Sequence, residues 1–197
     1  MNRAVYMRAL IALMFSSAGG AALAVATACS SPDASVTVDP TAGDAGPSRE
    51  QFDFVAPVLA RRCGSIDCHG SIYRNMRIYG YGGLRLGPEA VDPMTPMRVT
   101  ADEAQASYES VVGLEPEIMR AVVQSGGAGV ERLTFVRKGR GDEDHKGNKR
   151  LTAEADLCVT SWLANHVAED ACRTAGCFKT SVNDAGVSFN VVTGACP

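Results

Sequence analysis

Apolar residues recur at helical spacing in the stretch that precedes two closely spaced cysteines. The positions that share one helical face are Phe52, Val55, Leu59 and Cys63. Ser48 and Gln51 have the spacing of a capping box at the start of this helix. Because a proline deep inside a helix removes a backbone hydrogen bond, Pro57 is expected in the first turn, and regular helix is expected from about Phe54.

Local patterns predict three further helices. Thr100 and Glu103 form a second capping box, at the start of the segment TADEAQASYESVV. The segment EPEIMRAVVQSGG predicts a helix with Pro116 near its start and Gly126 beyond its end. The best helical pattern is LTAEADLCVTSWLANHV, which Thr152 is expected to cap. Its apolar stripe consists of Ala155, Cys158, Val159, Trp162, Leu163 and Val167.

The C-terminal tail has a different pattern. The segment CFKTSVNDAGVSFNVVTGACP contains turn-forming residues at 183–186, which predicts a short β-hairpin. The glycine-rich segment YGYGGLRLG, after the close cysteine pair, is expected to be a loop. The predicted fold class is therefore mainly α, with a small disulfide-rich β-hairpin at the C-terminus.

The first 28 residues are expected to be a signal peptide and not part of the fold. Arg3 and Arg8 precede an uncharged apolar run, residues 9–28, which ends in small residues. The stretch AVATACSS resembles a bacterial lipobox, in which Cys29 would become the lipidated first residue of the mature protein. By the same resemblance, Ser30 favours an exported protein anchored in the outer membrane, facing the periplasm or the cell surface. A transmembrane anchor or a secreted form is the alternative.

The composition of the remaining chain predicts three regions: a tether, a helical domain and a C-terminal hairpin. Residues 29–48 are small and polar and are expected to form a flexible tether. Residues 49–168 predict one helical domain, and residues 169–197 a hairpin held by cysteines. The chain carries 19 basic and 22 acidic residues, a net charge of −3, and losing Arg3 and Arg8 with the signal peptide makes it more acidic. A protein of this charge is not expected to bind nucleic acid.

The cysteines beyond Cys29 fall into two groups. Those near the C-terminus are expected to form two disulfides, because an exported protein meets oxidising conditions and a tail with few apolar residues cannot hold itself in place. They are Cys158, Cys172, Cys177 and Cys196, and their pairing stays open. The other two, Cys63 and Cys68, belong to RRCGSIDCHG and stand just before His69.

Two cysteines followed directly by a histidine are typical of covalent haem attachment, for which the usual spacing is C-x-x-C-H. Here four residues separate the cysteines. The segments FVAPVLARRCGSIDCHG, GGLRL and LTAEADLCVTSWL together resemble the cytochrome c domains of exported bacterial proteins. This resemblance, which covers residues 52–167 discontinuously, implies that the first and last helices pack together. It also implies that Cys63 and Cys68 attach one haem c and that His69 is the proximal iron ligand.

The same resemblance indicates a distal ligand. Such domains usually carry a methionine, in M-P-P, seven residues before the residue that opens the last helix, here Thr152. His145 occupies that position, and the chain contains no M-P-P, so His145 is the expected distal ligand. The alternatives are a five-coordinate iron, His166, or one of the methionines Met76, Met94, Met97 and Met119.

The resulting expectation is a membrane-tethered monohaem c-type cytochrome lipoprotein that carries single electrons to or from an unidentified redox partner protein. No G-x-S-x-G, H-E-x-x-H or phosphate-binding glycine loop is present, so the protein is not expected to be an enzyme. One alternative is a haem-free cytochrome-like lipoprotein that acts as a structural or binding module, with a disulfide between Cys63 and Cys68. A haem sensor is a second alternative. A zinc site with Cys63, Cys68 and His69 is a third, although adjacent ligands are awkward in a tetrahedral site.

Overall fold

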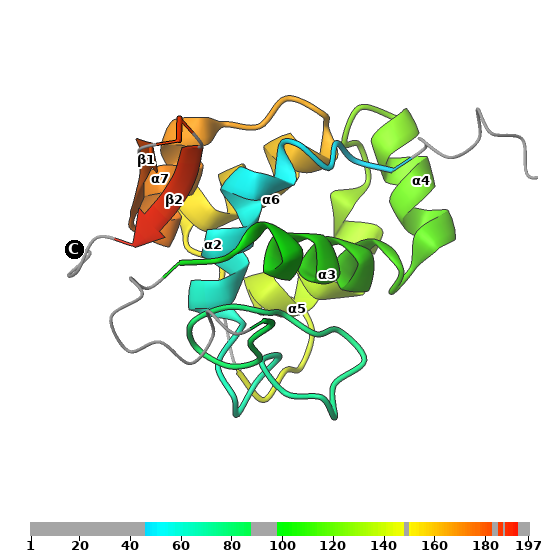
Figure 1. Ribbon diagram of the computed structural model, residues 1–197. Helices are drawn as coiled ribbons and strands as arrows, with labels where there is room; N and C mark the ends of the chain where they lie inside the picture. Colours follow the sequence, from blue (N-terminus) through cyan, green and yellow to red (C-terminus); the bar gives the residue numbers. More distant parts are fainter. Residues whose placement is uncertain (1–45, 88–97, 148–149, 183–184, 187, 193–197) are drawn as a thin grey trace, which may run out of the picture. The chain divides into compact units, whose positions relative to one another are not determined.

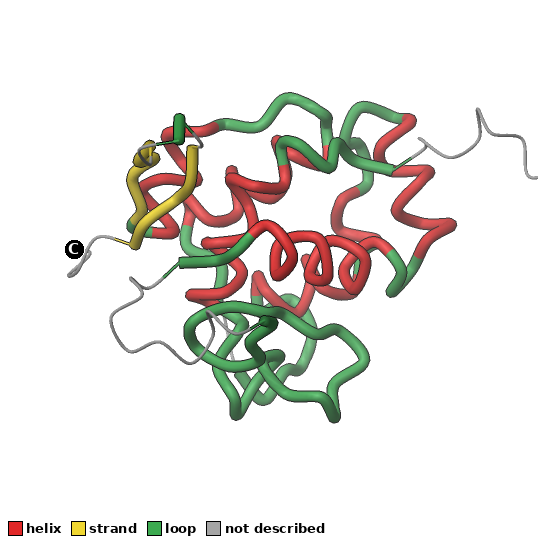
Figure 2. Tube along the Cα trace, viewed as in Figure 1, coloured by secondary structure: helices red, strands yellow, loops and turns green. Residues whose placement is uncertain are grey.

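Helices make up most of the regular structure in the computed structural model, as the sequence predicts (Figures 1 and 2). It describes residues 46–87, 98–147, 150–182, 185–186 and 188–192, all of them within the unit Pro40–Pro197. In chain order the elements are α2 (Phe52–Arg62), α3 (Ala101–Val112), α4 (Pro116–Gln124), η3 (Val130–Arg132), α5 (Thr134–Arg140), α6 (Ala153–Leu163), α7 (Glu169–Gly176), β1 (Phe178–Val182) and β2 (Ser188–Val192).

The described helices are all too short or too polar to cross a membrane. The predicted signal peptide, Cys29 and the tether up to residue 45 lie outside the described residues.

Helix α2 begins at Phe52, earlier than the predicted start near Phe54. Pro57 therefore lies inside the helix and not in its first turn, so that part of the prediction is wrong. A proline at this position leaves the carbonyl oxygen of Asp53 without its usual helical donor. Asn190 of β2 takes over, because its side-chain Nδ2 donates to that oxygen at 2.9 Å. A contact from far along the chain thus compensates for a local defect.

The capping box predicted at the start of α2 is only half formed. The backbone N–H of Gln51 donates to the Ser48 hydroxyl at 3.2 Å, as expected. The Gln51 side chain, however, reaches the end of α6, where it donates to the Asn165 carbonyl and accepts from the Val167 N–H, at 3.1 and 3.0 Å. Trp162 Nε1 donates to the Ser48 carbonyl at 2.8 Å. These hydrogen bonds join the start of α2 to the end of α6.

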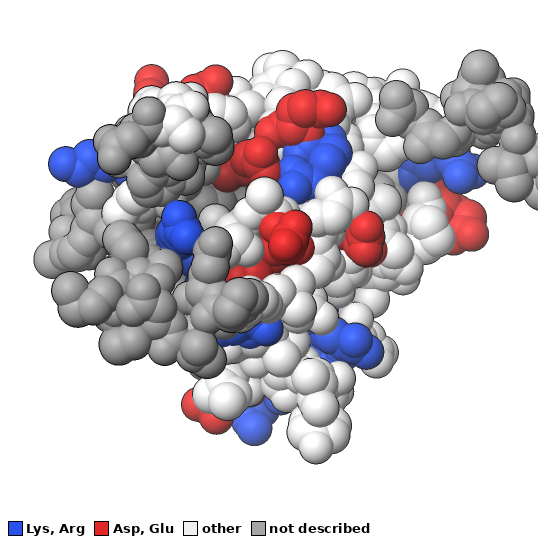
Figure 3. All heavy atoms as spheres, viewed as in Figure 1, with Lys and Arg blue, Asp and Glu red and all other residues white. Residues whose placement is uncertain are grey.

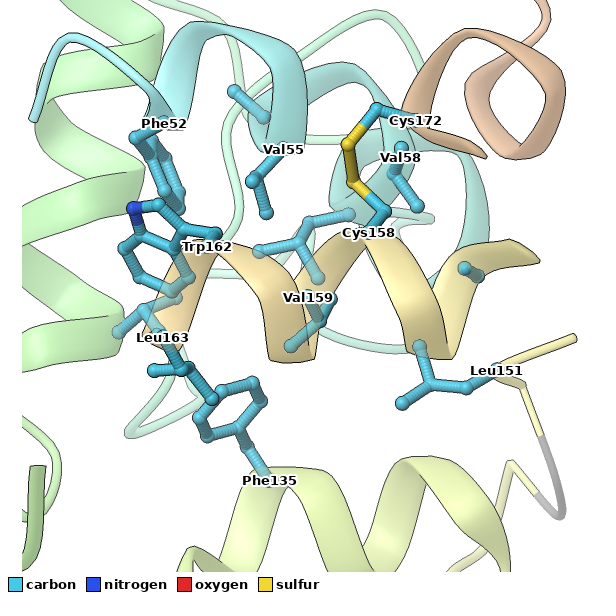
Figure 4. Close-up of a cluster of buried hydrophobic side chains, with 14 of the residues drawn as sticks. Phe52, Val55, Val58, Phe135, Leu151, Cys158, Val159, Trp162, Leu163 and Cys172 are labelled. Carbon is cyan, nitrogen blue, oxygen red and sulfur yellow. A yellow bond between two sulfur atoms is a disulfide. The ribbon is translucent and has the colours of Figure 1, made fainter. Parts of the chain in front are cut away.

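The core lies where α2 packs against α6 (Figure 4). The ring centroids of Phe52 and Trp162 are 4.9 Å apart, and Tyr108 of α3 packs edge-on against Phe52 at 5.5 Å. All of the apolar stripe predicted for α6 is buried except Val167, which follows the helix and is half-buried. The packing expected between the first and last predicted helices is therefore present.

The predicted caps of the other helices are confirmed. Thr100 and Glu103 cap α3 reciprocally, Pro116 begins α4, and the Thr152 hydroxyl accepts from the backbone of Ala155 at the start of α6. Glu103 is fully buried, and its carboxylate pairs with the Arg85 guanidinium at 2.6 Å. This ion pair fastens the loop before α3 to the helix.

Two α-helices of the described structure are absent from the sequence prediction, α5 and α7. Helix α5 contains Gly139, which lowers helix propensity. An added Cβ there would lie 2.8 Å from the Leu151 side chain, so the glycine allows that residue to pack closely. Helix α7 begins the tail that was predicted as a hairpin alone, and it packs against α2 and α6.

The tail carries the disulfide between Cys158 and Cys172, which joins α6 to α7 (Figure 4). Cys177 is also disulfide-bonded, and Cys196, the fourth cysteine of the predicted set, lies outside the described residues. Strands β1 and β2 pair antiparallel, which confirms the hairpin.

On the face drawn in Figure 3, acidic and basic side chains of the described residues are interspersed.

Candidate functional site

The motif RRCGSIDCHG continues from the end of α2 into a tight loop. The backbone N–H of Cys63 still donates to Leu59, as in the helix, and the chain then turns back. The N–H of His69 donates to the Cys63 carbonyl at 2.9 Å, and the N–H of Cys68 donates to Ser65, also at 2.9 Å. These bonds bring Cys68 and His69 back beside Cys63. The sequence pattern is thus assembled locally, within residues 63–70.

Three glycines let this loop pack against the segment that contains GGLRL. Gly64, Gly70 and Gly83 meet backbone to backbone: an added Cβ on Gly83 would lie 2.5 Å from the Cα of Gly70 and would also clash with the Gly64 carbonyl. The Ile66 N–H donates to the Gly82 carbonyl at 3.1 Å. Glycine is therefore required at these three positions of the two motifs, because any side chain would prevent the two chain segments from packing this closely. Figure 2 shows the described residues between α2 and α3 as loop.

Both cysteines of the motif are free thiols and are half-buried. The disulfide that the haem-free alternative requires between Cys63 and Cys68 is not formed in the structure. Burial raises the pKa of the Cys63 thiol to about 12, and the neighbouring Cys68 acts in the same direction. Cys63 is therefore protonated at neutral pH.

His69 is held in one orientation by its own loop. Its Nδ1 lies 2.9 Å from the carbonyl oxygen of Met76. Since a carbonyl can only accept, Nδ1 carries the proton and Nε2 keeps its lone pair. Burial lowers the pKa of His69 by more than the hydrogen bond to Met76 raises it, and the His145 ring adds to the lowering. The ring is thus neutral, with the second nitrogen free, as a metal-binding histidine needs to be.

His145 lies next to His69, although 76 positions separate them in the sequence. The centroids of the two rings are 5.9 Å apart and their planes differ by 21°. Nδ1 of His145 is buried and has no hydrogen-bond partner in the structure. Gly147 packs on this ring, since a Cβ there would lie 3.0 Å from Cε1. The two histidines predicted as axial ligands are therefore brought together.

The separation of the two ring centroids, 5.9 Å, is close to that of two imidazoles bound to one metal ion. Metal–imidazole bonds are about 2 Å long, so a metal bound through one nitrogen of each ring would place the ring centroids roughly 6 Å apart. Among the described residues, no group of three or more His, Cys, Asp and Glu side chains is arranged to hold a metal ion. A zinc site built from protein side chains thus has no ligand set there. A haem iron needs only two, because the macrocycle supplies the other ligands.

The other candidate ligands lie elsewhere or outside the described residues. His166 is exposed beyond the far end of α6, beside Gln51 and Phe54. The side chains of Met76 and Met119 are buried in the hydrophobic core. Met94 and Met97 lie outside the described residues.

Sequence reasoning missed the Met76 carbonyl as the group that orients His69, and Gly147 as the residue that packs on His145. A backbone carbonyl has no residue-specific signal, because every residue has one. Gly147 stands in the charged segment GDEDHKGNKR, where a glycine is ordinary. Only the tertiary structure gives these two positions their meaning.

No family model matches the chain, and no curated protein or solved structure matches it either. The features that bear on function are therefore the geometry and chemistry of Cys63, Cys68, His69 and His145.

Proposed function

We propose that this chain is a membrane-tethered monohaem c-type cytochrome that carries single electrons. The observation that carries the proposal is the pair of neighbouring rings, His69 and His145, 5.9 Å apart between centroids. The two histidines were singled out as proximal and distal ligands from separate segments of the sequence. Their proximity supports a shared function, because two distant loops meet at this one point.

In this proposal Cys63 and Cys68 hold the haem covalently. Each thiol would add its sulfur and its hydrogen across one vinyl group, which gives a thioether without loss of any atom. The free state of both thiols supports this role, since a disulfide would have consumed them. The loop closed by the hydrogen bond from His69 to Cys63 keeps the two sulfurs and the proximal ring in one short segment.

The haem iron would supply the chemistry, by gaining and losing one electron. The residues of the chain set the conditions for it. The Met76 carbonyl fixes the tautomer of His69 through Nδ1, and the lowered pKa of His69 means that no proton has to leave Nε2 before it binds a metal. Histidine on both sides of an iron gives a lower reduction potential than a histidine–methionine pair.

The tether and the partner belong to the same proposal but rest on the sequence alone. Lipidation at Cys29 would anchor the chain to the membrane, and a redox protein near the membrane would exchange the electrons. Cys29 and residues 30–45 lie outside the described structure. Residues 46–48, also predicted as tether, are described and are not free of the domain, because Tyr108 donates to the Pro47 carbonyl and Trp162 to the Ser48 carbonyl.

The experiment is a comparison of His145→Ala with His166→Ala in protein made by a host with haem-attachment machinery. His166 is the matched control, because it is the remaining histidine and is exposed away from the site. We expect the wild type and His166→Ala to share a low-spin spectrum and one reduction potential. His145→Ala should become high-spin and shift in potential. Identical low-spin spectra and potentials in all three proteins would remove His145 from the iron.

A further inference from the structure

A second feature of the structure is a pocket lined largely by arginines, with a volume of about 550 Å³. It lies between the end of α2 and the segment that leads into α6. Its lining residues are Arg61, Arg62, Tyr81, Arg150, Leu151 and Thr152. The volume is within the usual range for small-molecule sites. The lining contains three guanidinium groups and no carboxylate.

The pocket arginines form no ion pair with a carboxylate, unlike several other arginines of the described structure. Arg85, Arg137 and Arg140 each form an ion pair with a carboxylate at 2.6–2.9 Å. Within the described part of the chain, the three pocket arginines form no such pair.

One carboxylate lies near the pocket without pairing there. The pKa of Glu154 is lowered mainly by hydrogen bonds from its own backbone and from Thr152, and only slightly by the charge of Arg62. Glu154 and Arg62 form no ion pair in the described structure. Among the described residues, no carboxylate directly balances the positive charge of the pocket.

The polar groups at the pocket are also available as donors. Nε of Arg62 is buried and has no hydrogen-bond partner in the structure. Buried donors of this kind are normally paired. Burial raises the pKa of the Tyr81 hydroxyl, against the opposing effect of Arg61, so the hydroxyl keeps its proton and can donate. An acceptor carrying negative charge would satisfy these groups.

We propose that this pocket binds a small oxyanion, a phosphate or a carboxylate, through Arg61, Arg62 and Arg150. The planar guanidinium group matches the oxygens of such anions with paired hydrogen bonds. Binding of a free anion is independent of the proposed electron-transfer function, whereas binding of a prosthetic-group carboxylate rests on it. The anion could come from two sources: a free anion such as inorganic phosphate, or the carboxylate of a prosthetic group bound at the neighbouring site.

The pocket adjoins the candidate haem site, so a carboxylate of a group bound there would lie close to the arginines. The charges of Arg150 and Arg62 act on the Cys63 thiol, although burial and Cys68 outweigh them. Gly147 lies between Arg150 and the His145 ring, since a Cβ on it would be 3.2 Å from Nε of Arg150 and 3.0 Å from Cε1 of His145.

The test is calorimetric titration of the full-length, haem-free chain with inorganic phosphate at constant ionic strength. We expect saturable binding that weakens at least tenfold in Arg62→Gln and in Arg150→Gln. Arg120→Gln is the matched control, because it makes the same charge change on the exposed surface of α4 and should leave binding unchanged. Arg150 is exposed, so its replacement should leave the fold intact, which thermal unfolding checks.

A second arm repeats the titration with haem-loaded protein. Retained phosphate binding would identify a free anion as the ligand, and lost binding would identify the carboxylate of the bound group. Absence of saturable phosphate binding in the haem-free wild type, or equal affinity in all the variants, would overturn the proposal. Neither result depends on whether haem is attached to Cys63 and Cys68.

Discussion

Two pairs of cysteines in this chain differ in their bonding. Cys158 and Cys172 come from two packed helices, are fully buried, and form a disulfide. Cys63 and Cys68 lie in one loop, are half-buried, and remain free thiols. The same chain therefore contains one cysteine pair that links two helices covalently and one pair whose thiols are free to react.

The surroundings of the two pairs explain the difference. Helix α7 and the hairpin form a short C-terminal segment with few large apolar residues, so a covalent bond to α6 holds it in place. The loop of residues 63–70 is already closed by the hydrogen bond from His69 to Cys63 and by its packing on Gly83. A disulfide is not required to hold that loop. Free cysteines in a loop that is stable without them are consistent with a chemical function for the thiols.

The largest expected effect concerns the reactivity of Cys63 in folded, haem-free protein. Its pKa is raised by burial from 9.0 to about 12. Because only the thiolate reacts, and each pKa unit is a factor of ten, alkylation near pH 8 should be roughly a thousandfold slower than in the denatured chain. Timed alkylation followed by peptide mass spectrometry measures this. Equal rates in the folded and denatured chains would show that the thiol is not shielded as described.

Replacing each cysteine pair by alanine compares their structural roles. Loss of the Cys158–Cys172 bond, with a sequence separation of 14, should lower the free energy of unfolding by about 3 kcal/mol. The matched double variant, Cys63→Ala with Cys68→Ala, should cost less than about 1 kcal/mol in haem-free protein. Urea unfolding of both variants measures the difference. Equal losses would contradict the distinction between the two pairs.

Adjacent glycines test how the loop is held without a disulfide. An alanine at Gly83 would push its Cβ into the backbone of Gly64 and Gly70, which should cost about 1–3 kcal/mol. Gly82→Ala is the control, because its Cβ would have no neighbour closer than 3.4 Å. Unfolding free energies of the two variants are compared. If Gly82→Ala proves as harmful as Gly83→Ala, close packing of the loop is not the reason for the glycine.

The smallest effect concerns the contact between the hairpin and α2. Asn190→Ala removes the donor to the Asp53 carbonyl and should cost about 1 kcal/mol. Pro57→Ala returns a helical N–H to the same carbonyl, so the cost of Asn190→Ala should shrink in that background. A double-mutant cycle measures this coupling. Additive effects would mean that Asn190 does not replace the hydrogen bond that Pro57 removes.

Much of the fold could be predicted from local signals. The caps Thr100, Glu103 and Thr152, the proline at the start of α4 and the pairing of the two hairpin strands each depend on residues close in sequence. The start of α2 was predicted wrongly because the acceptor freed by Pro57 is satisfied by Asn190, more than 130 positions away. Helices α5 and α7 were missed because each is short and depends on tertiary packing rather than on a strong pattern of its own.

The candidate site was predictable only in part. Cys63, Cys68 and His69 are contiguous in one motif, and His145 was placed by a resemblance to a known spacing. That the rings of His69 and His145 meet, and that the Met76 carbonyl orients one of them, depends on how distant loops fold together. The arginine pocket combines residues from three segments, and none of its arginines has a sequence pattern that separates it from a solvated one.

The central claim is that Cys63 and Cys68 attach a haem. The most direct measurement is the intact mass of the denatured protein, with its absorption spectrum, after production in a host with haem-attachment machinery. We expect one haem that stays bound through denaturation and is absent from the double variant Cys63→Ala with Cys68→Ala. A wild-type chain with the haem-free mass, made under conditions in which a control cytochrome c is loaded, would contradict it.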